Sequence, residues 1–279
     1  FEPGKYIERE LTRDMIIRVL LLTGAGFGLT FGITFLLEIP FLAFGLVTVN
    51  PYTFEITFGP YVMILLTFAE LGFIIPPIWY ARSKGFGLGS IGLKISKFRR
   101  TSIAANIVEG ETVVQEYQVE DSNRMTEALK DILLGLLFGG MMLASNIFIT
   151  WLVSLGSGAV VDDSAGLFTS HDLFELGAWI IVMFVIVGFS EELLFRGFLQ
   201  RRMEIYFRGR YDSYKIVALA ITSFIFASMH LDIFGLAARF VLGLFMGYLA
   251  QRRQYSIIGP TVAHGFNNAA VVVFAFFGF

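Results

Sequence analysis

Long apolar stretches, separated by shorter polar ones, dominate the pattern along this chain. A helix needs about 20 mainly apolar residues to cross the hydrocarbon core of a bilayer. Most of the stretches approach or reach that length, and they predict spanning helices at residues 15–37, 61–79, 132–153, 173–198, 216–230, 233–250 and 257–277. The pattern therefore predicts an all-α fold: a polytopic membrane helix bundle of about seven to eight transmembrane helices.

Prolines and polar residues interrupt this pattern at a few places. Pro40 is expected to end or kink the first span, and Pro76-Pro77 is expected to close the second, because proline cannot donate a helical hydrogen bond. Residues 1–14 are polar and of mixed charge, which predicts a helix at the membrane interface.

A longer polar stretch separates the second span from the third. Residues 101–126 alternate in a β-like manner, which predicts a small hairpin or an ordered loop on the membrane surface. We therefore expect one transmembrane domain over residues 1–279, with a polar surface insertion at about 96–127 and the motif-bearing part at about 172–272.

Composition agrees with the membrane assignment. The chain has 279 residues, of which 56% are hydrophobic and 16% aromatic, and its mean hydropathy is +0.70. These values lie well above those of soluble domains. The formal net charge is −2, so a nucleic-acid partner is not indicated, and the absence of cysteine excludes disulfides and thiol nucleophiles.

The distribution of basic residues predicts an orientation in the membrane. Lys and Arg gather in the N-terminal segment and at 82–100, 199–215 and 252–253, whereas 41–57 and 156–172 contain none. Basic loops favour the cytoplasm. We expect an integral multi-pass membrane protein whose N-terminus is cytoplasmic and whose functional site opens toward the cytoplasm.

Two adjacent acids, Glu191 and Glu192, follow the apolar run of the fourth span. A carboxylate at membrane depth is costly, so it suggests function. Glu192 and Arg196 are four residues apart and share a helix face, which predicts a salt bridge, while Glu191 is turned by about 100°. The alternative is a helix end at the interface, with Arg196, Arg201 and Arg202 as anchors.

Polar residues in the later spans extend the candidate site. Phe226 and His230 are four residues apart, as are His264 and Asn268, so each pair shares one helix face. A single buried histidine is more often a structural residue than a ligand. Two of the three histidines lie in apolar segments, however, and we assign only His171, in an outer loop, a surface or structural role.

Two further charges, Glu70 and Arg239, lie within expected spans. An intramembrane charge needs a partner. We expect Glu70 and Arg239 to pair with each other, or Arg239 to pair with Glu192, as structural supports rather than as catalytic groups.

These residue types are suited to hydrolysis. A carboxylate such as Glu191 can take a proton from water, and an imidazole such as His230 can orient that water. His264 and Asn268 can donate hydrogen bonds to a developing oxyanion. Glu191, His230 and His264 could alternatively bind zinc with one open position, although the carboxamide of Asn268 argues mildly against a metal.

The ordered set Glu-Glu-x-x-x-Arg, Phe-x-x-x-His and His-x-x-x-Asn resembles the CPBP family of CAAX proteases and bacteriocin-processing membrane proteins, also called ABI proteins. The residues that carry the resemblance are Glu191, Glu192, Arg196, Phe226, His230, His264 and Asn268. The family includes the Ras-converting CAAX endopeptidase. The resemblance covers about residues 172–272, and the insertion at 101–126 has no counterpart that we can match.

The resemblance implies an intramembrane endopeptidase that cleaves near the C-terminus of a peptide or protein substrate, for which a prenylated tail is one option. It implies Glu191, His230, His264 and Asn268 as catalytic residues, with Glu191 activating water. Glu192, Arg196 and Phe226 would support them. We expect no cofactor and no bound metal; a zinc-dependent version of the protease is the alternative.

Two functions of other classes remain open. A non-catalytic membrane-binding or chaperone-like protein could use the same fold, although every expected catalytic position is filled. A transporter or proton relay would also contain buried Glu, His and Arg, but the chain has no internal repeat of the kind that many transporters contain.

The expected topology places Glu191 and His230, two residues of the same candidate site, at different depths in the membrane. If Glu191 lies near the cytoplasmic end of the fourth span, a fifth segment that starts near Tyr214 places His230 about 24 Å away along the membrane normal. This difference in depth disappears if residues 203–218 lie partly along the interface or outside the core, if the fourth span begins later and carries Glu191 deeper, or if that span is a long tilted helix through Arg202. The basic and aromatic residues from Arg201 to Lys215 favour an amphipathic surface segment.

Overall fold

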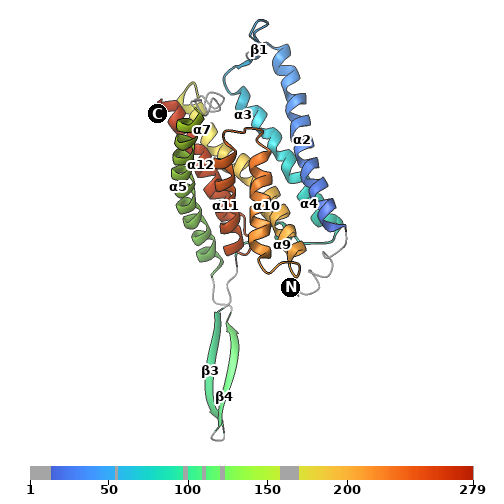
Figure 1. Ribbon diagram of the computed structural model, residues 1–279, viewed down its shortest axis with the longest axis vertical. Coiled ribbons are helices and arrows are strands. Elements are labelled where there is room, and N and C mark those ends of the chain that lie inside the picture. The colour runs from blue at the N-terminus through green and yellow to red at the C-terminus, as the bar shows by residue number, and fades with distance from the viewer. Residues whose placement is uncertain are drawn as a thin grey trace.

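The computed structural model describes residues 14–53, 56–96, 100–108, 111–119, 123–157 and 170–278. It is a bundle of helices with two small antiparallel hairpins, so the all-α membrane architecture is confirmed (Figure 1). Within this described part, five helices are long and apolar enough to cross a membrane: residues 15–43, 62–83, 124–156, 173–207 and 258–277. The expected interfacial helix at 1–14 and most of the 156–172 loop lie outside the described residues.

Two shorter helices complete the bundle. They are α10 (Tyr214–Ser228) and α11 (Leu236–Arg252), which pack against each other as an antiparallel pair. They correspond to the fifth and sixth expected spans. α11 also packs against α5 (Arg124–Ser157), and α5 in turn packs along the last helix, α12 (Ile258–Phe277).

The first two spans are longer than the prolines predicted. α2 (Met15–Ala43) continues through Pro40 for three more residues. In the second span, α3 (Val62–Thr67), the 3₁₀ segment η1 (Phe68–Ile74) and α4 (Ile75–Ser83) follow one another. The expected closure at Pro76-Pro77 is therefore wrong, because these prolines occupy the first turn of α4, where a missing backbone N–H costs nothing.

The hairpins lie at opposite ends of the molecule. β1 (Val47–Val49) and β2 (Ile56–Phe58) follow α2 and form a hairpin that was not predicted from the sequence. β3 (Arg100–Val108) and β4 (Glu111–Val119) pair from Arg100↔Val119 to Val108↔Glu111. This second hairpin confirms the β-like pattern of the polar stretch, and it projects away from the helices (Figure 1).

The fourth span is the central element. It runs from Leu173 to Phe207 as one helix, composed of α7 (Leu173–Val182), η3 (Met183–Gly188), α8 (Phe189–Glu192), η4 (Leu193–Gln200) and α9 (Arg201–Phe207). At its start, the Asp172 side chain accepts a hydrogen bond from Glu175 N at 2.8 Å, as a helix N-cap does. His171 bonds Glu175 at 2.7 Å, which agrees with its expected structural role.

Every residue from Ser190 to Gln200 is buried, so this part of the helix has no solvent- or lipid-facing side. η3 and η4 have π-helical hydrogen bonding, a local widening that is frequent at functional sites. Because such a helix is enclosed on all sides, its charged residues need partners within the protein.

The end of the fourth span corrects two expectations. Arg202 is fully buried, and its Nη1 donates to the carbonyl of Ser90 at 2.9 Å. Arg201 Nη1 donates to the carbonyls of Gly89 and Ser90, each at 2.8 Å. Residues 201–207 therefore continue the helix, and the buried Arg196 and Arg202 are not surface anchors, whereas residues 208–213 are exposed, as expected for a surface segment. The short segment η2 (Leu88–Ile91), which lies beside η4, supplies carbonyl acceptors.

Gly197 makes the close approach of η2 and η4 possible. A Cβ at this position would collide with the backbone carbonyl oxygen of Ile91. We expect Gly197→Ala to destabilise the protein by about 1–3 kcal/mol, because overpacking displaces backbone that cannot yield easily. The measurement is the thermal midpoint in detergent. Gly28→Ala is the control, since its Cβ would meet nothing within 4 Å; an equal loss in both variants would contradict this account.

Candidate active site

Glu191 and Glu192 lie near the middle of the central helix but have different surroundings. Glu192 is fully buried, and its Oε1 accepts hydrogen bonds from Arg196 Nη1 at 2.8 Å and pairs with His264 Nδ1 at 3.0 Å. The predicted salt bridge between Glu192 and Arg196 is therefore confirmed. Glu191 lines a cavity, and within the described part of the chain its Oε2 has no hydrogen-bond partner.

Arg196 links the helices around the glutamates. Its Nη2 donates to the carbonyl of Gly243 on α11 at 3.3 Å. Its guanidinium lies 4.5 Å from the centre of the Phe226 ring, a cation–π contact that is stronger away from water. Arg196 thus connects the central helix to α10 and α11 while it neutralises Glu192.

The Phe226 ring separates the two histidines from the arginine. It meets the His230 ring edge-on, with centroids 5.1 Å apart, and the His264 ring with centroids 5.9 Å apart. His230 Nδ1 lies 3.0 Å from the carbonyl oxygen of Phe226. A carbonyl only accepts, so Nδ1 must be the donor, and Nε2 of the neutral ring keeps a lone pair.

His264 and Asn268 approach Glu191 from α12. The Nε2 of His264 lies 3.9 Å from Glu191 Oε2, while its Nδ1 is held by Glu192. Asn267 Nδ2 donates to Asn268 Oδ1 at 3.2 Å, which leaves the Nδ2 of Asn268 free to donate toward the cavity. α12 comes this close to the central helix because Gly188 and Gly265 have no side chains at the contact.

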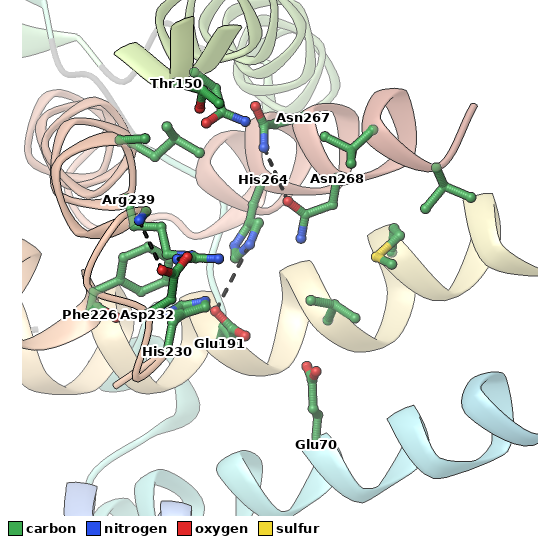
Figure 2. Close-up of a pocket in the computed structure, with 18 of the residues that line it drawn as sticks. Glu70, Thr150, Glu191, Phe226, His230, Asp232, Arg239, His264, Asn267 and Asn268 are labelled. Atoms are coloured by element: carbon green, nitrogen blue, oxygen red, sulfur yellow. Dashed lines mark hydrogen bonds and ion pairs between the residues drawn. The ribbon is translucent and has the colours of Figure 1, made fainter. Parts of the chain in front are cut away.

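The side chains meet in one cavity of about 250 Å³ (Figure 2). Its lining includes all four residues expected to be catalytic: Glu191, His230, His264 and Asn268. The lining also contains polar residues that the sequence analysis did not assign to the site: Glu70, Asn146, Thr150, Asp232 and Asn267. The arrangement places a carboxylate and an imidazole acceptor beside amide and imidazole donors in one cavity that polar and apolar residues line together.

The two extra charges have roles other than those expected. Arg239 Nη1 forms an ion pair with Asp232 in the α10–α11 loop, so the expected pairing of Arg239 with Glu70 or Glu192 is wrong. Asp232 is close because its Oδ1 accepts hydrogen bonds from Phe234 N and Gly235 N, which fold the loop back over α11. Glu70 points into the cavity (Figure 2).

The overlooked polar residues had weak signals in the sequence. Asn146 and Thr150 are four residues apart in an otherwise apolar span, so they share one helix face. Asn267 precedes Asn268 directly, but adjacent residues on a helix point in different directions. No local spacing connects Glu70 or Asp232 to the glutamate pair.

The expected difference in depth between Glu191 and His230 is absent from the structure, because the central helix is long. Glu191 is 16 residues from the end of that helix at Phe207, a rise of about 24 Å. α10 returns antiparallel over its 15 residues, a rise of about 21 Å. His230 therefore returns to the level of Glu191, as the alternative of a long helix through Arg202 required.

The cavity extends from Glu191 toward one end of the bundle. Met183 lies nearer the start of the central helix, and Thr150 and Val272 lie near the ends of α5 and α12. These helix termini lie at the end that bears β1, opposite the basic segments at 84–96 and 208–213 (Figure 1).

A metal-binding arrangement has little support in the geometry. In the part of the chain that the structure describes, no three His, Asp or Glu side chains are grouped as metal ligands would be. The zinc alternative needs Glu191 and the Nε2 atoms of His230 and His264, whose Nδ1 atoms bond to other acceptors, and these three groups are not among any such grouping of the described residues. We therefore derive no step from a metal.

Comparison with known proteins places this geometry in a family. Residues 174–270 match the family described as Rce1-like, type II CAAX prenyl endopeptidase. No curated protein matches the chain, and no solved structure matches it. The match spans the central helix, α10, α11 and most of α12, which contribute the glutamates, both histidines and Asn268. Residues 174–270 of this integral membrane protein are thus similar to the Rce1-like, CAAX-type family of peptidases, which supports the assignment to the CPBP family that the motifs indicated.

Proposed function

We propose that the protein is a glutamate-type intramembrane endopeptidase in which Glu191 activates water. The difference between the two glutamates carries this proposal. Glu192 is fully buried, and its Oε1 is paired with Arg196 and bonded to His264, whereas Glu191 lines the cavity and forms no hydrogen bond through Oε2 with the described residues. Of the two, only Glu191 lines the space in which a water could be bound.

The reaction follows from the groups around Glu191. A water between its carboxylate and Nε2 of His230 transfers a proton to Glu191, and its oxygen attacks the carbonyl carbon of the scissile amide. Asn268 Nδ2, and His264 Nε2 when both ring nitrogens carry hydrogen, donate to the oxyanion. The C–N bond then breaks as the amine nitrogen takes up a proton.

The substrate class follows the family description. CAAX-type enzymes act on C-terminal tails, and the family that residues 174–270 match is described as prenyl endopeptidases. We propose a peptide or protein substrate with a prenylated C-terminal tail. The cavity is enclosed by apolar helices, and a lipid-anchored peptide would already be concentrated in the bilayer beside it.

The test uses purified protein in detergent and a farnesylated peptide with a C-terminal CAAX sequence. Release of the last three residues, detected by mass spectrometry and lost in Glu191→Ala, supports the proposal. Cleavage that survives exhaustive chelation supports the general-base mechanism. Cleavage that chelation abolishes and stoichiometric zinc restores would reject that mechanism and favour the zinc-dependent version. Binding without cleavage would favour the chaperone-like alternative.

The orientation of the site requires a separate proposal. The cavity extends away from the basic segments, so a cytoplasmic N-terminus with cytoplasmic basic loops is incompatible with a cavity that opens toward the cytoplasm. We give priority to the basic loops, since their bias governs membrane insertion, and propose that the cavity opens on the opposite side. The detergent assay reaches the cavity in either orientation.

Single cysteines test the orientation, because the chain contains none of its own. We expect Asn50→Cys and Thr150→Cys to react with a membrane-impermeant maleimide added to intact cells. Lys84→Cys, at the basic end, should react only after permeabilisation. The reverse pattern would show that the cavity opens toward the cytoplasm and that the basic loops do not.

A further inference from the structure

Glu70 is a second acid of the cavity, and it comes from outside the family match. It lies in η1, in the second span, whereas the match begins at residue 174. Figure 2 shows its carboxyl group pointing from that helix toward Glu191. The helix of Glu70 packs against the central helix along α8 and η4, so the approach of the two acids is a result of helix packing.

The Glu70 carboxyl has no partner that would neutralise it. Its Oε2 is buried and accepts no hydrogen bond from any residue that the structure describes. The nearby arginines are already paired, Arg196 with Glu192 and Arg239 with Asp232. A buried carboxylate without a counter-charge is costly, and two such groups that face each other cannot both be ionised at low cost.

We propose that Glu70 is the proton donor to the leaving amine, which makes it a catalytic residue of the peptidase. This inference rests on the proposed function of Glu191. Glu70 enters the reaction protonated and Glu191 enters ionised. Two facing carboxyl groups with one proton between them can divide the acid and base roles in this way.

The step balances in protons and bonds. Glu191 takes one proton from water while the water oxygen forms its bond to the carbonyl carbon. Glu70 gives its proton to the amide nitrogen as the C–N bond breaks, which releases a carboxylic acid and an amine. Glu191 is then protonated and Glu70 ionised, and transfer of one proton between the facing carboxyls restores the starting state.

The positions of His264 and Asn268 agree with Glu191 as the base and Glu70 as the acid. His264 and Asn268 lie on the opposite side of Glu191 from Glu70 (Figure 2). A carbonyl oxygen directed at these two donors would leave the amide nitrogen nearer to Glu70. No other acid among the described cavity residues is available, since Asp232 is bonded to Arg239 and to two backbone N–H groups.

The test compares two substrates that share the acyl part and differ in the leaving group. One is the peptide amide, and the other is the corresponding ester with a phenol-type leaving group that departs without a proton. Glu70→Gln should lower amide hydrolysis by about 100-fold or more and change ester hydrolysis only a few-fold. The ratio of the two rates in one preparation does not depend on the fraction of folded protein. Glu191→Gln should lower both rates.

The pH profile provides a second readout. Amide hydrolysis by the unmodified protein should fall at high pH, where Glu70 loses its proton, and Glu70→Gln should remove this fall. The other titratable and charged groups that line the cavity with Glu70 are Glu191, His230, His264 and the ion pair of Asp232 with Arg239, and none of them is changed in this variant. Glu38→Gln, an acid of α2 outside the cavity lining, is the matched control and should keep the normal ratio and profile.

Two outcomes would overturn the inference. If Glu70→Gln lowers amide and ester hydrolysis equally, Glu70 supports the fold and donates no proton. If amide hydrolysis stays unchanged while Glu191→Gln abolishes it, Glu70 is not needed, although the proposed function stands. Failure of the unmodified protein to cleave either substrate would instead reject the proposed function.

Discussion

Replacing Glu191 with glutamine is expected to lower the rate of peptide hydrolysis by at least about 100-fold while the protein remains folded. General-base catalysis contributes about 10²–10⁴-fold, and glutamine cannot accept the proton from water. The variant should still fold, because the Oε2 of Glu191 accepts no hydrogen bond from the described residues. The substitution therefore removes few contacts that stabilise the fold. The measurements are kcat for the farnesylated peptide and the thermal midpoint in detergent.

Glu192→Gln is the matched control, because it makes the same chemical change at the adjacent residue. It should lower the thermal midpoint strongly, since it leaves the buried Arg196 without its counter-charge and weakens the bond to His264. A comparison of Glu191→Gln with Glu192→Gln therefore distinguishes a loss of catalytic rate from a loss of stability. If Glu191→Gln retains normal kcat, Glu191 is not the base.

The second large effect is expected from Arg196→Met, which should destabilise the folded protein by about 3–5 kcal/mol. Removing one partner of a buried ion pair leaves the other charge uncompensated, and Glu192 has no exposed surface. The variant also loses the bond to the Gly243 carbonyl and the contact with the Phe226 ring. The measurements are the yield of folded protein and the free energy of unfolding.

Two further variants show whether charge causes this loss. Arg196→Lys keeps the charge but lacks the planar guanidinium, so it should recover part of the stability. The double variant Glu192→Gln/Arg196→Met removes both charges and should be more stable than Arg196→Met alone. Equal stability of the double and single variants would indicate that packing around Phe226, and not the ion pair, explains the effect.

Local spacing in the sequence predicted the parts of the site that lie within single helices. Glu192 with Arg196, and Phe226 with His230, are four residues apart, and the helical period brings such residues together without information from other segments. The separation of roles between Glu191 and Glu192 has the same origin. The convergence of Glu191, His230, His264 and Asn268 in one cavity also agrees with prediction, because polar groups within apolar spans need polar partners.

The features that sequence did not predict depend on contacts between segments. Arg202 has the composition of an interfacial anchor, yet it is buried because the carbonyl of Ser90 accepts its hydrogen bond. Glu70 reaches the cavity through the packing of the second span against the central helix. Asp232 pairs with Arg239 because a loop folds back. Local periodicity contains none of this information.

The π-helical stretch η3, at Met183–Gly188, affects how the chain tolerates the loss of a residue. A π turn holds one residue more than the α turn that could replace it. A one-residue deletion there can be absorbed when the turn tightens, and both flanking parts of the helix keep their facing. The same deletion within α7 would rotate one part by about 100° relative to the other and turn Glu191 out of the cavity. Length variation in this helix should therefore be confined to its π-helical segments, η3 and η4.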